Sequence, residues 1–208
     1  MEKPNKTARA APWLLCLALV IATPPARGTI LKNGGDVSPS AFDPGRTVLA
    51  SLTGQTITTT TFSTTYSTWV YSDPKNMFFA GCLDFVYHFT NKGADANERF
   101  TMFAFGGFQV NVGFDSGTGL PPQSVNRTPS GQVIGFNYLE KELEPGQTTS
   151  LLEIQVNTNK WGEGKVSVQD GTAAFASAFA PIVIPEPSSL GLLGGGLLLA
   201  VGFLRKFC

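Results

Sequence analysis

The chain has 208 residues, and its 15 basic residues balance its 15 acidic ones. This length accommodates one domain of ordinary size with addressing segments at both ends. Residues 29–180 hold nine Lys or Arg against thirteen Asp or Glu, so this middle part is mildly acidic. A domain without a basic stripe argues against nucleic acid as a partner, because phosphate binding needs clustered cations.

The N-terminal segment has the three parts of a secretory signal. Lys3, Lys6 and Arg9 precede an apolar run over 10–22, and small residues surround Arg27 up to Gly28. The run is too short to span a hydrocarbon core of about 30 Å comfortably. We therefore expect residues 1–28 to be a signal peptide that signal peptidase removes.

The middle, 29–180, is typical of short antiparallel strands. Leu83, Phe85, Tyr87 and Phe89 alternate with polar positions, which indicates a strand with one face toward a core. The sequence predicts an all-β fold, an antiparallel β-sandwich, with a closed barrel as the alternative. The expected strands cover 46–52, 56–68, 83–90, 99–105, 108–114, 133–139, 151–158 and 165–170, with turns at 54–55, 72–76, 144–146 and 161–164.

Threonine dominates residues 56–68. Because threonine is β-branched, this run fits a half-exposed sheet face. A flat threonine array that contacts ice or a polysaccharide is the functional alternative.

Residues for nucleophilic or metal chemistry are scarce. His88 is the sole histidine and falls on the polar side of its expected strand, and Cys82 is the sole cysteine of the middle. A catalytic triad or a zinc site at the usual spacing has too few residues to be built. We therefore expect no catalytic residue, no metal and no cofactor. Cys82 is expected to be a buried apolar residue, with an intermolecular disulfide as the alternative.

Carboxylates and aromatic residues leave two further hypotheses open. A carboxylate-dependent hydrolase needs two acids facing each other in a cleft, whereas the acids of the middle are expected at solvated strand ends and turns. A carbohydrate-binding module would need an exposed aromatic platform, for which Trp69, Tyr71 and Trp161 are the candidates. The acids in question are Asp95, Glu98, Asp115, Glu140, Glu142, Glu144, Glu153, Glu163 and Asp170.

The last segment, 183–208, has three consecutive parts. Pro185, Glu186 and Pro187 come first, an apolar, glycine-rich stretch over 188–204 follows, and a basic tail over 205–208 ends the sequence. The stretch predicts a single transmembrane helix whose positive flank stays in the cytoplasm. The segment resembles the PEP-CTERM sorting tail of bacterial surface proteins, in which the motif is usually Val-Pro-Glu-Pro. Ile184 stands here in place of the valine.

This resemblance implies processing by an exosortase, a membrane transpeptidase-like enzyme, with Pro185, Glu186 and Pro187 as substrate residues. The expected route is export, anchoring in the inner membrane, and then the cell surface or extracellular matrix. Residues 85–91 and 143–148 also resemble domains often found ahead of such tails in exopolysaccharide-producing bacteria. We therefore expect a non-enzymatic structural or biofilm protein, with exopolysaccharide as a candidate partner.

Overall fold

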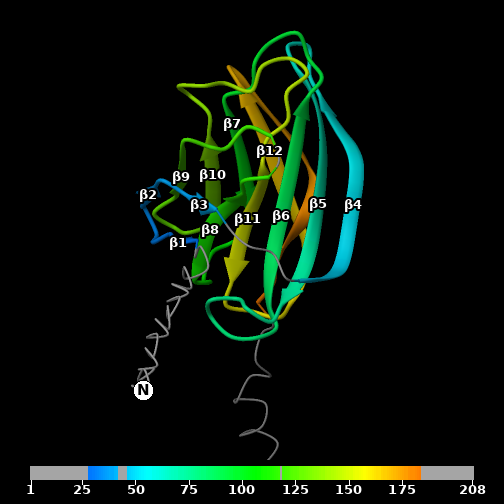
Figure 1. Ribbon diagram of the computed structural model, residues 1–208. Coiled ribbons are helices and arrows are strands. Elements are labelled where there is room, and N and C mark those ends of the chain that lie inside the picture. Colours follow the sequence, from blue (N-terminus) through cyan, green and yellow to red (C-terminus); the bar gives the residue numbers. More distant parts are fainter. Residues whose placement is uncertain (1–27, 42–45, 118, 184–208) are drawn as a thin grey trace, which may run out of the picture.

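The computed structural model describes residues 28–41, 46–117 and 119–183 (Figure 1). Two sheets form the fold, and no helix in these ranges is long and apolar enough to cross a membrane. The all-β prediction is confirmed. The predicted transmembrane segment at 188–204 and the signal peptide, except Gly28, lie outside the described residues.

The first sheet, sheet A, has the strand order β1-β8-β11-β6-β5-β4, and the short β3 pairs in parallel with β8. All its other pairings are antiparallel. Its strands are β1 (Thr29–Ile30), β3 (Ser40–Ala41), β4 (Thr47–Thr58), β5 (Ser63–Asp73), β6 (Cys82–Asn91), β8 (Val110–Asp115) and β11 (Leu151–Val156).

The second sheet, sheet B, is antiparallel throughout and has the order β13-β12-β7-β10-β9-β2. Its strands are β2 (Asp36–Val37), β7 (Arg99–Phe103), β9 (Ser124–Arg127), β10 (Val133–Asn137), β12 (Trp161–Asp170) and β13 (Thr172–Pro181). Because the two sheets share no strand, the fold is a sandwich and the barrel alternative is wrong.

Aromatic side chains fill the space between the sheets. The ring of Phe89 on β6 stacks on Phe100 of β7 at a centroid distance of 4.3 Å. The hydroxyl of Tyr87 crosses the core and donates to the Phe179 carbonyl at 2.7 Å, and Tyr66 does the same to Ser177 at 2.6 Å. Each tyrosine thus buries its ring while its polar atom is satisfied by the opposite sheet.

Strand β6 confirms the clearest pattern of the sequence. Leu83, Phe85, Tyr87 and Phe89 are at most 1% exposed and all belong to the core. Their burial follows from the two-residue period, which places alternate side chains on one face of the sheet.

Two expected turns were wrong, and the strand expected over 56–68 is divided between β4 and β5. No turn occurs at 54–55. Strand β4 continues through this point with a bulge between Leu52 and Gln55, and Gly54 lies in the bulge with φ +65°. The chain reverses instead at 59–62, where the Thr59 hydroxyl accepts from the amides of Thr61 and Phe62. The predicted turn at 161–164 is the first part of β12.

Strand β13 was not expected at all, because it is built mainly from alanine and alanine has a low β propensity. The small side chains are required by close packing: a Cβ added at Gly164 would lie 2.4 Å from the Cβ of Ala180 on the paired strand.

Candidate functional site

The outer face of sheet A carries a group of buried polar side chains. The register places Tyr71 of β5, Asp84 of β6, Gln155 of β11 and Asn111 of β8 side by side in one row. Asp84, Gln155 and Asn111 are at most 5% exposed. Polar groups at this depth must be paired to be tolerated.

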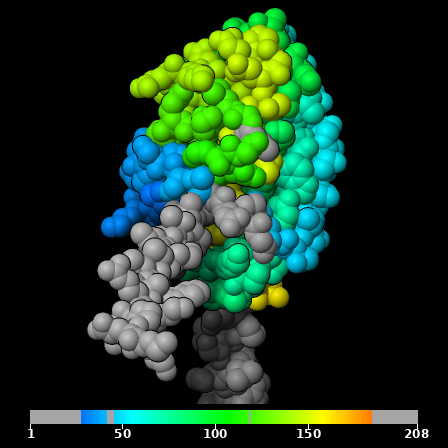
Figure 2. Space-filling view, viewed as in Figure 1, coloured from blue at the N-terminus to red at the C-terminus, as the bar shows by residue number. Residues whose placement is uncertain are grey.

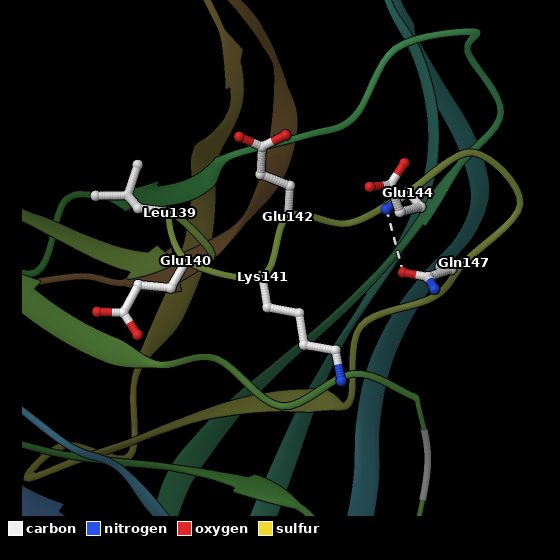
Figure 3. A pocket seen from close by; sticks show the side chains of 6 residues that line it. All are labelled: Leu139, Glu140, Lys141, Glu142, Glu144 and Gln147. Carbon is white, nitrogen blue, oxygen red and sulfur yellow. Dashed lines mark hydrogen bonds between the residues drawn. The ribbon is translucent and has the colours of Figure 1, made fainter.

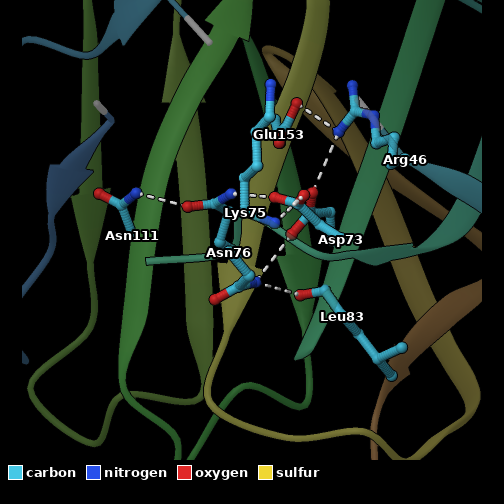
Figure 4. A network of polar contacts seen from close by, with 9 residues as sticks. Arg46, Asp73, Lys75, Asn76, Leu83, Asn111 and Glu153 are labelled. Carbon is cyan, nitrogen blue, oxygen red and sulfur yellow. Dashed lines mark hydrogen bonds and ion pairs between the residues drawn. The ribbon is translucent and has the colours of Figure 1, made fainter. Parts of the chain in front are cut away.

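Arg46, just before β4, supplies the positive charge of this group (Figure 4). Its Nη1 lies 2.5 Å from Oε2 of Glu153 and 3.5 Å from Oδ2 of Asp84. The guanidinium also lies over the Tyr71 ring, 4.5 Å from the centroid. Side-chain exposure is 5% for Arg46, 1% for Asp84 and 2% for Glu153, so solvent is excluded from the ion pairs.

Burial governs the protonation of the two carboxyls. It raises the pKa of Asp84 to about 8, with Glu153 and Asp73 adding to the increase and Arg46 opposing it. Burial also raises the pKa of Glu153, while Arg46 and a hydrogen bond with Asp84 oppose the rise. One positive charge faces two carboxyls, so burial favours a bound proton on this pair of carboxyls, while the remaining carboxylate charge is balanced by Arg46.

The polar row continues through neutral amides. Gln155 Nε2 donates to Oδ2 of Asp73 at 3.1 Å, and Asn111 Nδ2 donates to Gln155 Oε1 at 2.8 Å. Asn76 Nδ2 donates to Oδ1 of Asp84 at 2.9 Å. We call Arg46, Asp73, Asn76, Asp84, Asn111, Glu153 and Gln155 the Arg46 network.

Sequence reasoning missed this network. Glu153 was expected at a solvated strand end or turn, but it lies within β11 and is 1% exposed. Asp84 and Glu153 face each other as a hydrolase would require. They are closed to solvent and bridged by Arg46, however, so no substrate can reach them in this conformation. The available signal was an acid within a strand of otherwise buried residues.

The three aromatic residues predicted for glycan contact lie on two sheets. Trp69 and Tyr71 are half-buried on the outer face of β5 in sheet A. Trp161 starts β12 in sheet B, is 37% exposed and packs edge-on against Phe179 at 5.2 Å. The fold therefore does not bring the three together into one platform.

Cys82 and His88, the two residues considered for nucleophilic chemistry, lie six positions apart on β6. Cys82 is fully buried, as predicted for a small apolar residue, and forms no disulfide within the described part of the chain. His88 is half-buried on the outer face of β6, and burial lowers its pKa. Within the described ranges, no three His, Cys, Asp or Glu side chains are grouped so that they could hold a metal ion.

A pocket of about 450 Å³ lies in the loop between β10 and β11 (Figure 3). Leu139, Lys141 and three glutamates line it, and the Glu144 amide donates to Gln147 Oε1 at 3.1 Å. Figure 3 shows that the carboxylates of Glu140, Glu142 and Glu144 point in different directions. They therefore do not converge on a common ligand position.

Comparison with known proteins bears on the segment that follows β13. Neither the search of curated proteins nor the search of solved structures returned a match. A family model, the PEP-CTERM protein-sorting motif, matches residues 183–206, which include Pro185, Glu186 and Pro187. These three residues lie outside the described residues. The chain therefore carries the PEP-CTERM protein-sorting motif, which indicates exosortase-dependent sorting of a surface protein.

Proposed function

We propose that this protein is an exported, non-enzymatic component of the bacterial surface or extracellular matrix, released or transferred when an exosortase cuts near Pro185, Glu186 and Pro187. The observation that carries the proposal is the match of residues 183–206 to the sorting motif, which begins two residues after β13 ends at Pro181. Prolines at 185 and 187 disfavour helix in the residues before them, so the segment suits binding in an extended form.

The Arg46 network supports the non-enzymatic part of the proposal. Its carboxyls are paired internally at 1–2% side-chain exposure, which suits a structural role within the fold. Contact with exopolysaccharide is the weaker proposal, because the candidate aromatics Trp69 and Trp161 lie on different sheets.

The test is intact-mass analysis of the mature protein from a host that has an exosortase. We expect a product that has lost residues 1–28 and the segment after the Pro-Glu-Pro motif. Replacing Pro185, Glu186 and Pro187 together by Ala should leave the segment attached, whereas Ser188→Ala with Ser189→Ala should be processed normally. A mature wild-type chain that still extends to Cys208 would refute the sorting proposal.

A further inference from the structure

The sorting segment follows β13, so it starts at the end of the sandwich where β13 ends. Pro181, the last residue of β13, pairs with Trp161, and the amide of Ile182 donates to the Lys160 carbonyl at 3.3 Å. Within the described ranges, alternating strand directions bring five loops to this end. We call these loops, together with Ile182 and Val183, the exit end; the loops are 31–35, 74–81, 104–109, 128–132 and 157–160.

Figure 1 places the loop after β5 at this end and the loop between β10 and β11 at the opposite end. Figure 2 shows the latter loop, in yellow-green, protruding at the top of the molecule. The two ends are therefore separated by the length of the strands.

Exposed hydrophobic side chains gather at the exit end. Of the ten large hydrophobic residues that are exposed in the described part of the chain, six lie in it or directly adjoin its loops. A monomeric soluble protein rarely gathers such residues in one place without a binding role. They are Ile30 (52% exposed), Met77 (36%), Phe79 (50%), Trp161 (37%), Ile182 (41%) and Val183 (67%).

Charge is also distributed unequally between the two ends. The five loops of the exit end carry Lys32, Lys75 and Lys160, all exposed, and no Asp or Glu; two acids directly adjoin the loops, the exposed Asp36 and the buried Asp73. At the opposite end, loops 92–98 and 138–150 hold five acids against two lysines. An anionic surface would therefore attract the exit end and repel the other one.

Buried contacts hold the exit end in shape. Asn76 anchors loop 74–81 to Asp84 from within, and its Oδ1 accepts from the Phe78 amide at 3.0 Å, beside the exposed Met77 and Phe79. The apolar side chains are thus presented by a fixed loop, which lowers the entropic cost of binding.

Arg127, 5% exposed, fixes three of the other loops. Its guanidinium donates to the carbonyls of Gly131 (3.0 Å), Leu31 (3.3 Å), Phe105 (2.8 Å) and Phe108 (2.9 Å). These carbonyls belong to loops 128–132, 31–35 and 104–109. The bonds bring a further positive charge to the exit end.

We propose that the exit end is a lipid-binding surface that rests on anionic headgroups of the bilayer in which the sorting segment is inserted. This inference rests on the proposed function. Four residues separate Val183 from the apolar stretch over 188–204, so the tether spans at most about 18 Å. The exit end thus stays close to the bilayer for as long as the segment is attached, and weak contacts suffice.

The chemistry of the exit end matches that of a bilayer interface. Lysines bind anionic headgroups, and aromatic and aliphatic side chains enter the boundary between headgroups and acyl chains. The acidic opposite end then faces away from the membrane.

The test uses the full chain, reconstituted in phosphatidylcholine vesicles with or without phosphatidylglycerol. Cys16→Ser and Cys208→Ser leave the buried Cys82 as the remaining native thiol. A fluorophore is attached at Met77→Cys, and the matched control carries it at Leu139→Cys at the opposite end. Nitroxide-labelled headgroups report contact between the fluorophore and the lipid.

We expect quenching at position 77 to exceed that at position 139 by roughly threefold or more in anionic vesicles, and to fall at high salt. The triple variant Lys32→Gln, Lys75→Gln, Lys160→Gln should lower the quenching at 77. The variant Lys92→Gln with Lys141→Gln, which removes lysines from the opposite end, should not.

Flotation of the vesicles separates this inference from the proposed function. If the chain floats but both positions are quenched equally or not at all, the lipid-binding surface is refuted and the sorting proposal stands. If the chain does not float, the inserted segment is refuted and the lipid surface with it. Two other outcomes would overturn the inference. If the fluorophore at position 77 becomes buried only in native membranes, the surface binds a protein partner. If it becomes buried without lipid when the chain self-associates, the surface binds a second copy of the chain.

Discussion

Two buried arginines organise opposite surroundings in this domain. Arg46 lies on the outer face of sheet A against the carboxyls of Asp84 and Glu153. Arg127 lies at the end of β9 in sheet B and binds backbone carbonyls. The charge of Arg46 is neutralised by carboxyls, which titrate. The charge of Arg127 is solvated by carbonyl dipoles, which do not titrate.

The difference separates two ways of stabilising an interior charge. Pairing with carboxyls makes the stability of the Arg46 network depend on pH, because its acids have raised pKa values. Carbonyl solvation keeps the charge of Arg127 uncompensated, which suits the lipid-facing role proposed for the exit end. Four substitutions test this contrast, in order of decreasing effect.

Arg46→Ala should destabilise the fold by about 4 kcal/mol near neutral pH, because it leaves two buried carboxyls without a cation. The loss should be smaller at acidic pH, because protonation removes the carboxylate charge that Arg46 balances, and should grow toward pH 9. Urea unfolding at several pH values measures it. Lys165→Ala, at an exposed position of β12, is the control and should change little. A loss of stability that does not vary with pH would contradict the assignment.

Arg127→Met should destabilise the fold by about 3 kcal/mol, because it leaves several buried carbonyls without donors. This loss should be the same across the pH range in which Arg46→Ala varies. Hydrogen exchange should locate the loosening in loops 31–35, 104–109 and 128–132. A pH-dependent loss, or faster exchange spread evenly over both sheets, would mean that the two arginines do not differ as described.

Neither arginine environment could be read from the sequence, although much of the fold could. The core face of β6 was predicted because Leu83, Phe85, Tyr87 and Phe89 repeat with a period of two. The partners of Arg46 and Arg127 are set by strand order, which places Arg46 beside Glu153, more than a hundred positions away. Periodicity reports which side of a strand is buried but not which strands are neighbours.

The sorting segment, unlike the two arginine environments, could be predicted from the sequence because a local motif specifies it. Pro185, Glu186 and Pro187 stand together in the sequence, so their match to a family model needs no tertiary information. Strand β13, next to it, was missed because packing against Gly164 outweighs the low β propensity of alanine.

Asp84→Asn should flatten the pH dependence of stability. The pKa of Asp84 is raised to about 8 in the folded protein, whereas the unfolded chain has the ordinary value of 3.8. The stabilisation from the bound proton is complete below about pH 4 and is lost as pH rises toward 8, by at most about 1.4 kcal/mol per pH unit. Asn keeps the shape without titrating, so the variant should gain stability relative to wild type as pH rises over this range. Parallel urea-unfolding curves against pH would refute the raised pKa.

Arg46→Lys should have the smallest effect, about 1 kcal/mol, because an ammonium still supplies the positive charge that Glu153 and Asp84 require. It loses the guanidinium plane over Tyr71, where the centroid distance is 4.5 Å. Arg127→Lys is the matched substitution and should cost more, since one ammonium cannot reach carbonyls arranged around a planar fork. Urea unfolding of the pair at one pH compares them directly. Equal losses would show that charge alone, rather than the geometry of the donors, decides both sites.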